Sequence, residues 1–150
     1  MKKTILILIA ILAVCGGSYY YYMQSDKKMI NDFACDVTND AIKLEDVINK
    51  YLLYNKDSKE ITLIQLKYIR TAYKKNPSNN ITVSSYEDAV EQKKVEDHII
   101  SEDYDNVFII FVNDKIQIPI LLNANSKIIA ISTINKGGHR FFMRLDGKKD

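Results

Sequence analysis

The sequence predicts an α+β fold: an N-terminal membrane or signal helix, then two or three helices packed on a curved antiparallel meander of four to five strands. Three observations predict it. A long uncharged segment opens the chain, apolar residues then recur at helical spacing, and the last third alternates β-rich runs with short turns. Proline and glycine are scarce, so we expect one domain without long linkers.

Residues 1–25 are expected to be a signal anchor or signal peptide, and residues 26–150 a single exported α+β domain. Lys2 and Lys3 precede the apolar run TILILIAILAV, and no side chain that is charged near neutral pH follows before Asp26. As a helix, residues 4–23 would rise about 30 Å, enough to cross the hydrocarbon core of a bilayer. The tyrosines at 19–22 would then lie at the far interface, and the N-terminus would stay in the cytoplasm.

Two other N-termini remain open. The stretch LAVC at 12–15 resembles a bacterial lipobox, which would make Cys15 a lipidation site, although Val14 replaces the small residue usual before that cysteine. Cleavage after Gly16 or Gly17 is the other alternative, because small residues suit a peptidase. Anchored, lipidated or secreted, the domain is expected outside the cytoplasm, in a bacterial-type cell envelope.

Apolar side chains alternately three and four residues apart predict helix over residues 28–54. The polar residues Thr38, Asn39 and Asp40 interrupt this stripe and predict a kink or break. Cys35 lies within the pattern, and we expect it to be a small packed residue.

A second helix is expected over residues 58–75, because Asp57 and Glu60 have the spacing of a capping box and Pro77 follows the helix. Ser85 and Asp88 repeat that spacing and predict a short helix over 86–100. The expected inner face of the second helix consists of Ile61, Ile64, Tyr68 and Ala72.

Four β-rich runs follow, at 107–112, 116–122, 127–134 and 139–145, separated by turns rich in Asn, Asp and Gly. Residues 81–84 are a further candidate strand. Pro119 cannot donate to a strand ladder, so its strand is predicted to be an edge or locally irregular. The order of elements resembles the cone-shaped nuclear-transport-factor-like and cystatin-like folds, in arrangement only, so it implies no functional residues.

Charge is unevenly distributed along the domain. Residues 81–114 hold nine acidic side chains and two lysines, a net −7, whereas residues 127–150 hold six Lys and Arg and two Asp, a net +4. The two segments either neutralise each other or meet a partner. The net charge of +2 does not indicate nucleic-acid binding. The candidate partner-binding residues are Glu96, Asp97, His98, Glu102, Asp103, Arg140 and Arg144.

No catalytic motif is present in the sequence. His98 and Glu102 have a helical spacing that can hold a metal, but no further ligand completes the site, so no cofactor is expected. The sequence therefore predicts a non-catalytic module, tethered by residues 4–23, that binds an unidentified protein or small ligand. One version is an accessory or immunity-type protein whose acidic segment 87–105 masks a basic target. The alternatives are a small-pocket hydrolase or isomerase using His98 or a buried carboxylate, and an oligomerisation unit.

Overall fold

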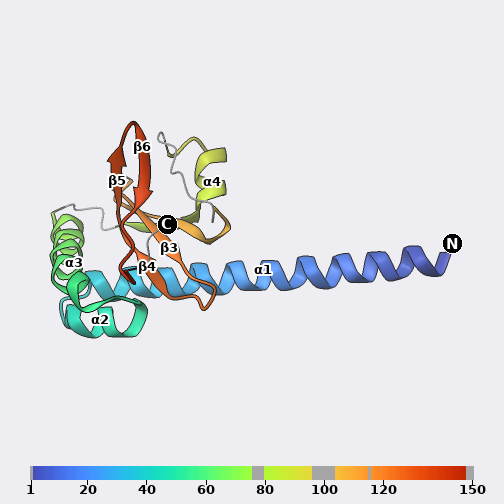
Figure 1. The fold of residues 1–150 in the computed structure, drawn as a ribbon, viewed down its shortest axis with the longest axis horizontal. Helices are drawn as coiled ribbons and strands as arrows, with labels where there is room; N and C mark the ends of the chain where they lie inside the picture. Colours follow the sequence, from blue (N-terminus) through green and yellow to red (C-terminus); the bar gives the residue numbers. More distant parts are fainter. Residues whose placement is uncertain (1, 76–79, 96–103, 115, 148–150) are drawn as a thin grey trace.

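The computed structural model describes residues 2–75, 80–95, 104–114 and 116–147, but not the side chains of residues 2–19 and 104. Within these ranges the chain is α+β, with four α-helices, a four-stranded antiparallel sheet and a separate two-stranded sheet (Figure 1). The helices are α1 (Lys2–Thr38), α2 (Leu44–Tyr51), α3 (Lys59–Lys74) and α4 (Tyr86–Glu91). The strands are β1 (Ile81–Ser85), β2 (Val107–Val112), β3 (Ile116–Leu122), β4 (Ile128–Ala130), β5 (Thr133–Lys136) and β6 (His139–Phe142).

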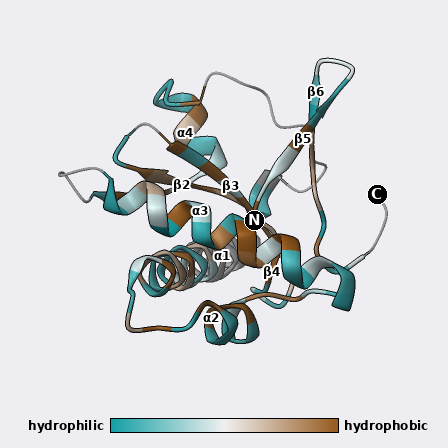
Figure 2. Ribbon diagram, turned by 90° about the vertical axis from the view of Figure 1, so that its left-hand side faces the viewer, coloured by the Kyte–Doolittle hydropathy of each residue, from teal (hydrophilic) through white to brown (hydrophobic). Residues whose placement is uncertain are grey.

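The larger sheet has the order β1-β2-β3-β4, and both of its faces are covered. Every residue of β2 is buried, which explains why its sequence, VFIIFV, is apolar without alternation. Phe108 and Ile110 pack with α1, α2 and α3 on one face. Ile109 and Phe111 pack on the other face with α4 and with Phe142 of β6. Figure 2 shows the apolar ribbon of β2 and β3 behind α3.

The predicted meander is confirmed for β2, β3 and β4, which pair antiparallel in chain order, but not for the end of the run 127–134 or for the last run. The run 127–134 divides into β4 and β5, and β6 pairs with β5 in the separate sheet. Gly137 and Gly138, with φ of 63° and 82°, make the tight turn between β5 and β6. Because Phe142 is buried against the face that carries α4, this hairpin covers the sheet instead of extending it. The fourth strand of the larger sheet is β1, and every residue of β1 pairs with β2.

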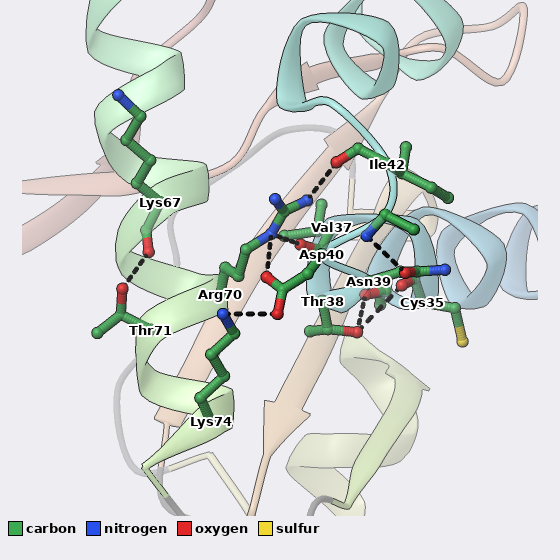
Figure 3. A network of polar contacts seen from close by, with 12 residues as sticks. Cys35, Val37, Thr38, Asn39, Asp40, Ile42, Lys67, Arg70, Thr71 and Lys74 are labelled. Carbon is green, nitrogen blue, oxygen red and sulfur yellow. Dashed lines mark hydrogen bonds and ion pairs between the residues drawn. The ribbon is translucent and has the colours of Figure 1, made fainter.

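The predicted break near residues 38–40 is confirmed, since α1 ends at Thr38 and α2 begins at Leu44. Arg70 of α3 holds this corner together (Figure 3). Its Nε donates to the carbonyl of Val37 at 2.6 Å and its Nη2 to that of Ile42 at 2.9 Å. The Val37 carbonyl is among those that a helix leaves unpaired at its C-terminus, where a cation also interacts favourably with the helix dipole.

The start of α3 differs from the predicted capping box. A short 3₁₀ turn, Lys56–Ser58, precedes the helix, and the side chain of Asn55 accepts from the Ser58 N–H at 2.9 Å. Asn55 therefore caps this segment in place of Asp57. The predicted cap at Ser85 is confirmed, because its Oγ accepts from the Asp88 N–H at 3.1 Å. Helix α4 ends at Glu91, and residues 96–100 of the predicted helix lie outside the described residues.

The predicted inner face of α3 was wrong. Thr62, Leu66 and Ile69 are buried, whereas Ile61, Ile64 and Tyr68 are 43%, 60% and 66% exposed. Arg70 follows one turn after Leu66 on the same side of α3, so its bonds to Val37 and Ile42 accompany the burial of Leu66 and Ile69 in the core. The expectation that Cys35 is packed was also wrong, since that residue is exposed.

Helix α1 extends well beyond the rest of the fold toward the N-terminus (Figure 1). Its C-terminal part packs in the core through Ile30, Phe33 and Val37. Among the residues that the structure describes in full, no helix is both long and apolar enough to span a membrane. Most of the predicted span, residues 4–19, has side chains outside that description, so the span stays a prediction.

Asp36 joins α1 to α2. Its Oδ2 accepts from the Tyr51 hydroxyl at 2.7 Å and from Lys50 Nζ at 2.9 Å. These bonds, led by the one from Tyr51, lower the pKa of the Asp36 carboxyl, and contacts with Tyr51 and Asp36 raise the pKa of Lys50. The ring of Phe33 packs edge-on against Tyr51, with centroids 5.6 Å apart.

The pKa shift of Asp36 makes the stability of this corner depend on pH. The folded-state pKa lies below the ordinary value of about 3.9, so the stabilisation is present above that value and is lost as the pH falls through the folded pKa. We expect Asp36→Asn to lower the free energy of unfolding at pH 7, and we expect this loss to shrink progressively as the pH falls below the ordinary carboxyl pKa of about 3.9. Urea unfolding of the full chain in detergent, followed by tyrosine fluorescence, measures both. Asp32→Asn, which removes only an exposed pair with Lys28, is the control. An Asp36→Asn effect that stays the same size from pH 7 down through the acid range would contradict the assignment.

Candidate functional site

A groove of about 550 Å³ lies between α3, the edge of β3 and the β5–β6 hairpin. The elements that form it cover opposite faces of the sheet, since α3 packs on one face and β6 on the other. Its lining consists of Ile64, Gln65, Tyr68, Ile69, Ile116, Gln117, Ile118, Pro119, Ile131, Ser132, Thr133, Asn135 and Arg140.

The floor of the groove is an open edge of the sheet. Only Leu121 and Leu122 of β3 pair with β4, after which the chain turns away through Ile131 and Ser132 into the hairpin. Residues 116–120 therefore pair with β2 alone among the described strands. This confirms the prediction for Pro119, which lies in the part of β3 that is an edge.

One wall of the groove is the exposed apolar face of α3. Ile64 and Tyr68 line it, and a neighbouring hollow of about 320 Å³ shares Tyr68 and Ile116 and adds Thr71, Ala72 and Lys75. Three of the four residues predicted to face the core thus border the two hollows instead. The stripe seen in the sequence exists, but it faces the open edge of the sheet.

Polar groups from the hairpin and from α3 also line the groove. Asn135 and Arg140, which pair across the hairpin, both line the groove. Gln65 of α3 donates from Nε2 to Ser132 Oγ at 2.8 Å, while its Oε1 is buried without a hydrogen-bond partner among the described residues.

The groove lining that the structure describes contains no Asp, Glu, His or Cys. It offers apolar surface, amide and hydroxyl groups and one guanidinium. These groups can hold a ligand in place, but they do not include a nucleophile paired with a base or an acid–base pair. Elsewhere in the described residues, no group of three or more His, Cys, Asp or Glu could hold a metal ion.

Of the predicted site residues, Arg140 lines the groove and Arg144 does not. The Nη2 of Arg144 donates to Asp146 Oδ2 at 3.0 Å, and its Nε donates to Oδ1 at 3.2 Å. The carboxylate of Asp146 is buried in this pair, outside the groove. Five predicted residues lie outside the described residues, and Cys15 lies in α1 with its side chain undescribed. These five are Glu96, Asp97, His98, Glu102 and Asp103.

The sequence reading missed Gln65, Gln117 and Tyr68 as members of one site. The available signal was α3 itself, because its apolar residues form two stripes, one through Leu66 and one through Ile64 and Tyr68. Only one apolar stripe of a helix can pack against the core, so the second stripe of α3 is left exposed. Comparison of the chain with protein-family models, with curated proteins and with solved structures finds no match.

The orientation of α3 can be tested by a matched pair of substitutions. Leu66→Ala should lower the free energy of unfolding by about 2–5 kcal/mol, because Leu66 is fully buried. Ile64→Ser should change it by no more than about 0.5 kcal/mol, because Ile64 is 60% exposed. Urea denaturation of the full chain in detergent measures both. The reverse ranking would show that the stripe through Ile64 faces the core.

Proposed function

We propose that the chain is a membrane-tethered, non-catalytic binding module of a bacterial-type cell envelope, and that its groove receives a protein partner outside the cytoplasm. The observation that carries the proposal is the groove at the open edge of β3, with the exposed apolar residues Ile64 and Tyr68 beside it. Apolar side chains gathered around a hollow are typical of binding sites. The lack of carboxylate, histidine and cysteine in the described lining supports binding over catalysis.

The tether is the second part of the proposal. Helix α1 runs without a break from Lys2 to Thr38, across the expected boundary at residues 25 and 26. If residues 4–23 span the membrane, the domain sits on a rigid continuation of the spanning helix. Helix α3 lies at the end of the domain far from the N-terminus (Figure 1), so the groove would face away from the membrane. A partner could then reach it from the envelope space.

Two further expectations belong to the proposal. The acidic segment 87–105 would form a second partner surface, and the long helix on a sheet would be a cone-shaped or cystatin-like arrangement. Exposed tyrosines at 20–22 support an interfacial position for that part of α1.

Site-specific photo-cross-linking tests the groove. A benzoylphenylalanine at position 68 of the full-length chain, expressed in its own host, should give one discrete adduct that maps to a single segment of one partner. The same group at Leu53, exposed but outside the groove, is the matched control. The identified partner, once purified, should bind the full-length chain in micelles. Identical adducts at both positions, or none at position 68, would count against a partner site in the groove.

The intact mass of the protein from host membranes tests the tether. An uncleaved anchor predicts a mass that begins at Met1 and a chain that stays in the membrane after carbonate washing. A mass beginning at a diacylated Cys15 would replace the spanning helix with a lipid anchor. A mass beginning near Ser18 in the soluble fraction would remove the tether from the proposal.

A further inference from the structure

The position next to β3 in the sheet is only half occupied. Leu121 pairs with Ala130 and Leu122 with Ile128, and from Ile131 onward the chain leaves this position for the hairpin. Beyond that point, the edge of β3 from Ile116 to Pro119 forms the floor of the groove. An extended segment lying in the groove would continue the line of β4 along β3.

The direction of the free backbone groups follows from the ladder. The Asn113 N–H donates to the Asn80 carbonyl at 2.8 Å, so these two residues form a hydrogen-bonded pair at the end of the β1–β2 ladder. Because hydrogen-bonded and non-hydrogen-bonded pairs alternate, Ile110 and Phe108 bond toward β3, opposite Ile118 and Ile120.

Gln117 and Pro119 therefore turn their backbone groups outward, into the groove. Pro119 loses no ladder bond, because its missing N–H would point away from β2. The edge offers one donor, the Gln117 N–H, and two acceptors, the carbonyls of Gln117 and Pro119. An incoming strand can make three main-chain hydrogen bonds here, and the missing N–H of Pro119 removes a fourth.

The two walls differ in chemistry. A strand in this position alternates its side chains between the face of α3, with Ile64 and Tyr68, and the face of the hairpin, with Asn135 and Arg140. Lys136 follows next along the hairpin and is exposed. Lys136 therefore gives the hairpin side of the groove an exposed cation. Charge complementarity thus favours a segment whose hairpin-facing side chains are acidic.

We propose that the partner of this groove is an extended protein segment that alternates apolar and acidic residues and adds a short strand to β3, bonding to Gln117 and Pro119. This inference rests on the proposed function and specifies its partner by class. Main-chain hydrogen bonds align the segment with β3. Its alternate side chains contact the α3 wall and the hairpin wall, which gives specificity.

The test uses a fluorescent peptide of alternating Val and Glu, with the full-length chain in micelles and anisotropy as the readout. Three control peptides separate the contributions to binding. A peptide with Lys for Glu tests charge, one of the same composition without alternation tests the side-chain pattern, and one N-methylated at every second residue tests main-chain hydrogen bonding. We expect each control to bind at least about tenfold more weakly. Equal binding of the Lys or N-methylated peptide, or no binding of the Val–Glu peptide, would overturn the inference.

Two variants of one residue provide the matched test in the protein. Gln117→Pro removes the outward N–H without removing a bond to β2, whereas Gln117→Ala keeps that N–H and loses the side-chain bond to the Lys94 carbonyl. We expect Gln117→Pro to weaken peptide binding at least about tenfold and Gln117→Ala to weaken it less than about twofold. Equal losses would contradict strand addition. Should Gln117→Pro fail to fold, the N-methylated peptide decides the same point.

The cross-link at position 68 separates this inference from the proposed function. An adduct that persists in Gln117→Pro would leave the partner site standing but refute strand pairing. The absence of any adduct in the parent chain would refute the proposed function itself. Sedimentation identifies a second copy as the occupant: a dimer of the full chain that becomes monomeric in Gln117→Pro would overturn the proposal of a foreign segment.

Discussion

Burial of β2 on both faces is the constraint on which the rest of the structure depends. A strand with no polar residue is stable only inside a sheet that is covered twice. The chain supplies one cover from α1, α2 and α3 and the other from α4 and the β5–β6 hairpin. The hairpin can serve as a cover only if the chain leaves the sheet after β4. The open edge of β3 is thus a consequence of how the second face is buried.

The bonds from Arg70 and the burial of Leu66 and Ile69 together set which side of α3 faces outward. With the guanidinium bound to the carbonyls of Val37 and Ile42, the stripe through Leu66 faces the core and the stripe through Ile64 faces the edge of β3. Lys74 and Asp40, 2.6 Å apart, add an exposed pair of small energetic weight beside it (Figure 3). A contact between α3 and the end of α1 therefore shapes a groove on the other side of α3.

Much of the fold was readable from local patterns. The break after Thr38, the cap at Ser85, the runs at 107–112 and 116–122 and the edge position of Pro119 each depend on residues close in the chain, and each is confirmed. The wrong predictions concern features that depend on contacts between residues far apart in the chain. Nothing local distinguishes the two stripes of α3, and nothing local shows that the run at 127–134 divides because Phe142 covers the face with α4. The groove joins α3, β3 and the hairpin, so a reading by segments could not assemble it.

An exposed sheet edge beside apolar side chains invites pairing with any other strand, and Pro119 limits that risk. It sits where an N–H would otherwise point outward beside β4, so one donor is missing from the unpaired edge. The Gln117 N–H and the two carbonyls are left unpaired by the described strands, beside the wall that carries Ile64 and Tyr68. Pro119 thus removes one backbone donor from an edge that the described strands leave unpaired.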